Sequence, residues 1–103
     1  MEGNRHYLGS EKKLAINITC QGFNMNTDPW TVSVINGNKK IVCDKTQNAV
    51  KDTSGQWYLL IDTAKLGVGK PKAIIEIDVP DVDFEDTYRH EVYVYHLEPI
   101  IKP

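Results

Sequence analysis

The chain lacks any long hydrophobic run, and its longest apolar stretch, Trp57–Ile61, spans five residues. A membrane-spanning helix needs roughly 20 apolar residues, so the sequence predicts no membrane association. The first residues also lack the apolar segment, roughly 7–15 residues long, that marks a secretory signal peptide. We therefore expect the protein to act in the compartment where it is made, or to leave it within a larger particle.

The net charge and the number of cysteines are also small. Twelve basic and 14 acidic residues give a net charge of −2, so we expect no nucleic-acid partner, which would need a basic face. Cys20 and Cys43 are the two cysteines, and neither has a neighbour at a metal-ligand spacing. Two reduced, buried thiols are the preferred interpretation without a signal peptide. A disulfide is the alternative in an oxidising compartment.

Apolar and polar residues alternate along most of the chain, and no segment shows a sustained helical period. This alternation is typical of β-strands that bury one face. Four segments show it clearly: residues 14–20, 30–35, 73–79 and 91–97. Residues 56–62 are apolar on both faces, which predicts a central strand covered twice. Residues 63–69 leave room for one helical turn.

A tight hairpin is predicted at Asn36-Gly37, a dipeptide that readily takes the positive φ angles of such a turn. A two-residue loop pairs Val32 with Ile41, and a loop longer by two residues pairs Val34 with Ile41. Both registers place apolar residues opposite apolar residues. A loop of odd length would turn the returning strand over, so an even loop is favoured.

Six or seven short strands, with turn signals between them, predict an all-β fold. We expect an immunoglobulin-like β-sandwich of about seven antiparallel strands. Residues 13–103 would form this single domain, and residues 1–12 a flexible N-terminus. Cys20, Trp30 and Cys43 occur in the order found in antibody domains, but the cysteines lie too close in sequence for that family.

The acidic loop after residue 80 is the strongest candidate for chemistry. Asp81, Asp83 and Glu85 have the alternate spacing of a calcium loop, but Asp86 and Val92 occupy the positions of its glycine and its bidentate glutamate. A solvated turn is the preferred interpretation.

Other catalytic patterns are missing from the sequence. His90 and His96 would share a strand face but lie about 20 Å apart, too far for one metal ion. The glycines of residues 66–70 precede a strand rather than a helix, which argues against nucleotide binding. We therefore expect a non-enzyme without cofactor, metal or small-molecule substrate.

The last clear strand, residues 91–97, offers a candidate interface. We expect its valine face to point inward: Val92, Val94 and His96. The opposite face would then present a patch suited to a protein partner or self-association: Tyr93, Tyr95 and Leu97. Cross-strand packing within the domain is the alternative for these tyrosines.

The last third of the chain resembles a known domain. Leu66-Gly67-Val68-Gly69, a strand, the segment Ile77–Asp86 and Arg89 are similar to a small β-sandwich domain of phage and prophage structural proteins from gut anaerobes. That domain occurs in tail, baseplate and fibre-type chains. The family loop tends to read Asp-Gly where this chain has Asp86-Thr87.

The resemblance implies a virion-assembly or attachment module located in the virion or the host bacterial cytoplasm. Its partners would be other virion or tail proteins, or further copies of itself. It implies structural turn roles for Gly67, Gly69, Asp81 and Asp83, beside the hairpin residues Asn36 and Gly37. A surface or secreted adhesin or carbohydrate-binding module is the alternative, and a small inhibitor of a host enzyme is a third.

Overall fold

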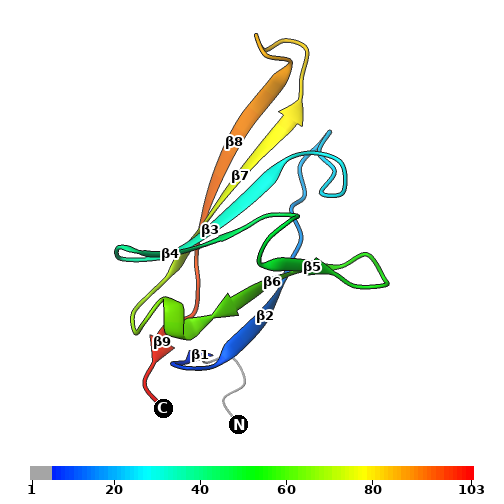
Figure 1. Cartoon of the computed structure of the whole chain (residues 1–103). Helices are drawn as coiled ribbons and strands as arrows, with labels where there is room; N and C mark the ends of the chain where they lie inside the picture. The colour runs from blue at the N-terminus through cyan, green and yellow to red at the C-terminus, as the bar shows by residue number, and fades with distance from the viewer. Residues whose placement is uncertain (1–5) are drawn as a thin grey trace.

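The computed structural model describes residues 6–103, in which strands joined by turns and loops make up nearly all of the regular secondary structure (Figure 1). The prediction of an all-β chain is confirmed. One 3-10 turn, η1 (Thr63–Lys65), is the helical turn expected between residues 63 and 69. The strands are β1 (His6–Tyr7), β2 (Glu11–Ile16), β3 (Trp30–Asn36), β4 (Lys39–Cys43), β5 (Ala49–Lys51), β6 (Trp57–Asp62), β7 (Lys72–Pro80), β8 (Tyr88–His96) and β9 (Ile100–Ile101).

Two antiparallel sheets carry most of the strands. One has three strands in the order β2-β6-β5, and the other has four in the order β4-β3-β7-β8. β6 is central in its sheet, as predicted, but its second face is not covered because Leu60 is 39% exposed there. A short parallel pair, β1 with β9, joins the two ends of the described chain.

Both sheets contribute to one hydrophobic core. The inward residues of β3 and β7 alternate with exposed or half-buried ones, and so do those of β6. Trp30 of β3 meets Trp57 of β6 edge to face, with ring centroids 5.4 Å apart and planes at 80°. Their indole nitrogens donate to the loop before β3, at Met25 O (2.9 Å) and Asn26 Oδ1 (3.1 Å). This bonding lets two large polar-tipped rings lie in the core.

The β3–β4 hairpin has the even register that the sequence favours. Val34 pairs with Ile41, and Asn36 pairs with Lys39 across a two-residue turn. Gly37 has φ +62° whereas Asn38 has no positive φ, the pattern of a type II′ turn with glycine first. The register is therefore the one that pairs Val34 with Ile41, as expected for a four-residue loop. Asn36 and Lys39 also pair, so the turn itself has only two residues, Gly37 and Asn38.

The N-terminal boundaries differ from those predicted. Residues 1–5 lie outside the described part of the chain, but residues 6–12, assigned to a flexible N-terminus, include β1 and the start of β2. β2 ends at Ile16 rather than Cys20. Its alternation nevertheless continues, because Ile18 and Cys20 still pack against the core after the chain has left β6.

The facing predicted for β8 is wrong. Val92 and Val94 point outward and are each 53% exposed, whereas Tyr93 packs against the core. The cause is the register with β7, in which Tyr93 lies opposite the buried residue Ile75. Residues directly opposite in an antiparallel pair share a face, so the tyrosine face is the inner one.

Candidate functional site

The β7–β8 hairpin is the most prominent feature of the molecule. Its strands pair without a break from Lys72–His96 to Pro80–Tyr88. Figure 1 shows the hairpin extending beyond β3 and beyond the three-stranded sheet, with its tip at the end opposite to β1 and β9. The tip carries two exposed apolar side chains, Val82 (88%) and Phe84 (48%). A projecting, partly apolar tip is a surface that suits contact with another macromolecule.

The acidic loop at this tip is held by its own carboxylates. Asp81 accepts the amide of Asp83 (3.1 Å) and forms an ion pair with Arg89. Asp86 accepts the amide of Tyr88 (3.1 Å), and Thr87 takes a left-handed φ of +67°. Among residues 6–103, no three His, Cys, Asp or Glu side chains are grouped to hold a metal ion. Asp81 thus has the geometry of a turn residue.

A polar cluster lies on the inner face of β8 below the tip. Glu91 Oε2 accepts from Arg89 Nε (2.6 Å), and Glu91 Oε1 accepts from the Tyr93 hydroxyl. Cys20 Sγ also donates to Glu91 Oε2, at 3.7 Å. These bonds, Tyr93 first, lower the pKa of Glu91, and the bond to Glu91 raises the pKa of Tyr93 to about 12. At neutral pH the cluster therefore holds an ionised carboxylate and a neutral phenol, which fixes the inner face of β8.

The outer face of the same sheet separates its charges. His90 bonds Asp78 (Nδ1–Oδ1 2.9 Å) and lies 3.8 Å from Glu76 at the end near the tip. The hydrogen bond to Asp78 raises the pKa of His90. At the other end, Lys40 and Lys72 flank Ile35 across neighbouring strands. The face is thus acidic toward the tip and basic toward the turn of β3–β4.

At the end of the sheet away from the hairpin tip, the predicted turn residues Gly67 and Gly69 lie around the side chain of Asn36. Asn36 Nδ2 donates to the carbonyls of Leu66 (2.8 Å), Gly67 (3.3 Å) and Val68 (3.1 Å). Gly67 and Gly69 both have positive φ, +75° and +147°. The sequence singled out Asn36 and these glycines separately, and the fold places them in one joint.

The predicted interface residues of β8 differ in how much of their surface is exposed. Tyr93 and Leu97 pack against the core, whereas Tyr95 is 56% exposed. The two tyrosines line a shallow recess of about 150 Å³ whose other wall is the segment after β2: Asn17, Ile18 and Thr19. The exposed apolar residues of β8 that the sequence assigned to the core are Val92 and Val94.

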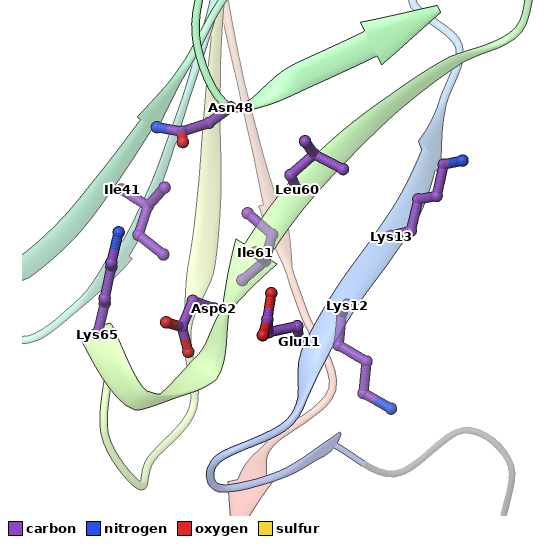
Figure 2. Close-up of a pocket in the computed structure, with 9 residues that line it drawn as sticks. All are labelled: Glu11, Lys12, Lys13, Ile41, Asn48, Leu60, Ile61, Asp62 and Lys65. Atoms are coloured by element: carbon purple, nitrogen blue, oxygen red, sulfur yellow. The ribbon is translucent and has the colours of Figure 1, made fainter. Parts of the chain in front are cut away.

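A larger pocket of about 330 Å³ opens between β4 and β6 (Figure 2). It exists because β5 pairs only with residues 57–59 of β6, which leaves the last residues of β6 without a strand on that side. Figure 2 shows Ile41 and Ile61 inside it, with Glu11, Asp62 and Lys65 along one rim. Sequence reasoning missed this pocket because a short strand leaves no signal in the residues that surround it.

The two acids of this rim, Glu11 and Asp62, lie directly opposite each other on β2 and β6. Asp62 is engaged as the N-cap of η1, where it accepts the amide of Ala64 (3.1 Å). Like charges directly opposite each other disfavour strand pairing at this point. The pocket lies at the lower limit of the 300–1,000 Å³ typical of ligand sites, roughly the volume of a small polar ligand.

No protein-family model, curated protein or solved structure matches this chain. Within residues 6–103 there is no helix long and apolar enough to cross a membrane.

Proposed function

We propose that this chain is a non-catalytic module that acts through protein–protein contacts, with the β7–β8 hairpin as its contact element. The observation that carries the proposal is that β8 is a nine-residue edge strand beside an apolar tip. An edge strand offers a row of unpaired backbone N–H and C=O groups to a partner. Val82, Phe84, Val92 and Val94 add apolar area along the same hairpin.

We further propose that the fold is an immunoglobulin-like β-sandwich. In such domains one sheet contains strands B, E and D, and the other contains G, F and C, extended in some members by C′. The orders β2-β6-β5 and β8-β7-β3-β4 agree with B-E-D and G-F-C-C′. Trp30 then lies on strand C, where antibody domains also bury a tryptophan, and it is 3% exposed.

The proposed setting is a phage or prophage particle, in which the module would be a structural or attachment part. The resemblance of residues 66–89 to virion domains supports this setting, and so does the position of the hairpin tip, far from β1 and β9 in Figure 1. A module joined to a particle near those strands would present the tip outward.

Mass spectrometry of purified particles from an induced producing strain tests this setting. We expect the chain at a stoichiometry comparable with other particle proteins. Its absence from clean, abundant particles would overturn the virion assignment.

The recess beside Tyr93 and Tyr95 favours a second candidate, a carbohydrate-binding or adhesin-type module. An exposed tyrosine ring next to the amide of Asn17 offers an apolar surface and hydrogen-bonding groups together. Binding on a glycan panel that Tyr95→Ala abolishes, while Tyr88→Ala retains it, would support this candidate over the first.

A further inference from the structure

The four edges of the two larger sheets differ in how they are protected against pairing. β2 begins with Glu11-Lys12-Lys13 and β4 with Lys39-Lys40, and β5 has only three residues. Lysines and short length are the usual means of blocking an edge. β8 is nine residues long and contains no lysine, proline or glycine, and its register with β7 has no bulge. It is the edge best suited to receive another strand.

The backbone groups that face this edge can be identified. Leu97 donates its amide to Pro71 O (3.0 Å), and Thr87 O accepts the amide of Asp81 (2.9 Å), so both odd-numbered residues turn toward β7. Direction alternates along a strand of an antiparallel ladder. The free edge is therefore formed by the N–H and C=O groups of the even residues: Tyr88, His90, Val92, Val94 and His96.

We propose that β8 pairs antiparallel with β8 of a second copy of this chain, with Val92 opposite Val92 of the other copy. This register pairs all nine residues, since Tyr88 then meets His96 at both ends. Up to about ten backbone hydrogen bonds would join the copies, two for each outward-facing residue pair. The inference rests on the proposed function, because it names the partner of the same contact element.

The side chains of β8 favour this register over registers shifted by one or two residues. On the inner face Arg89 meets Tyr95 and Glu91 meets Tyr93, so no like charges are directly opposed. Moving the register by two in one direction opposes Glu91 to itself. Moving it by two in the other opposes His90 to His96 and leaves fewer residues paired. A shift by one would reverse every side chain.

The charges of the whole sheet also select an antiparallel second copy. Each copy has Lys72 opposite His96 at one end of the hairpin and the acidic tip at the other. Antiparallel pairing places the basic end of each copy beside the acidic tip of its partner, with the tips far apart. Complementary charge of this kind favours one orientation and strengthens association at low salt.

Analytical ultracentrifugation of the full chain, from about 5 μM to about 1 mM, tests the proposal. The wild-type chain should form a dimer that weakens with added salt. Val92→Lys opposes two like charges at the symmetry centre and should weaken the dimer by roughly 100-fold. Val92→Glu should do the same. An equimolar mixture of the two variants should recover a dimer, because only a residue opposite itself gives that rescue.

Val50→Lys is the matched control, since it adds the same charge to an exposed strand valine of the other sheet, on β5. It should leave the dimer intact, and circular dichroism should show all variants folded. A wild-type monomer throughout the range, or a dimer that survives Val92→Lys, overturns self-pairing. So does the loss of rescue in the mixture. If the wild-type chain is a monomer throughout, the partner of β8 would be a strand of a different protein. The mass spectrometry of particles would still test the proposed setting independently.

Discussion

The side-chain amide of Asn36 lies so close to Gly69 that the glycine has no room for a side chain. A Cβ built at Gly69 would be 2.6 Å from Asn36 Oδ1 and 3.0 Å from Nδ2. The amide cannot simply turn away, because Nδ2 donates to three carbonyls of residues 66–68. The side chain of Asn36, the last residue of β3, thereby fixes the path by which the chain enters β7.

Gly69→Ala should lower the free energy of unfolding by about 1–3 kcal/mol, through the clash and through its φ of +147°. Chemical denaturation measures this. Gly55→Ala is the control for backbone strain, because Gly55 has φ +94° and open space around its Cβ. In an Asn36→Ala background the cost of Gly69→Ala should fall. Additive costs would show that the two residues are not coupled.

Tyr93→Ala should destabilise the protein more than Val94→Ala, because Tyr93 packs on the core and bonds Glu91. We expect a loss of about 2 kcal/mol or more for the tyrosine, and below about 1 kcal/mol for the exposed valine. Denaturant titration at low protein concentration gives both values. The reverse order would mean that the valine face of β8 is the inner one after all.

The two cysteines should differ in reactivity. Burial raises the pKa of the Cys43 thiol to about 11, and Cys43 is 0% exposed, whereas Cys20 is partly exposed beside Glu91. A thiol must be accessible and ionised to react. A disulfide-exchange reagent at neutral pH should modify one thiol per folded chain and the second only after denaturation. Cys20→Ser should remove the fast phase, and a fast phase that persists would contradict this assignment.

His90 should titrate above its ordinary pKa of 6.5, because its hydrogen bond to Asp78 stabilises the protonated ring. A group whose pKa is raised by folding stabilises the fold fully below its unfolded pKa, and this contribution disappears as the pH passes the folded pKa. The stability difference between wild type and Asp78→Asn should therefore be largest below pH 6.5 and shrink as the pH rises above it. NMR titration of the imidazole should show its pKa falling in Asp78→Asn, and an unchanged pKa would exclude this pair as the cause.

The β3–β4 hairpin and the inward face of β7 could be predicted because local signals suffice there. Gly37 marks the tight turn, which follows one residue later than Asn36-Gly37 implied. In β7, Ile77 lies between Glu76 and Asp78. β8 could not be oriented from its sequence, since both of its faces carry apolar residues. Its facing depends on which residue of β7 stands opposite, as the pairing of Ile75 with Tyr93 shows.

Features that depend on pairing with distant segments could not be predicted from the sequence either, because the pairing partner is not visible in the local residues. β9 consists of Ile100 and Ile101 between prolines, and nothing local indicates that it pairs in parallel with β1. The pocket of Figure 2 depends on where β5 stops, and that is decided by its pairing with β6. The ion pair of Asp81 with Arg89 across the hairpin could not be predicted either, because it requires the register of β7 and β8.

The parallel pair of β1 and β9 has a mechanical consequence. His6 pairs with Ile100 and Tyr7 with Ile101, and Leu8 donates to Ile101 O (2.8 Å). Tension applied at the N-terminal end of β1 and the C-terminal end of β9 would pull the two parallel strands in opposite directions along their common axis. Their hydrogen bonds would then carry the load together, in shear, rather than opening one after another. The sheets behind them, with the contact hairpin, would stay unloaded until this pair gave way.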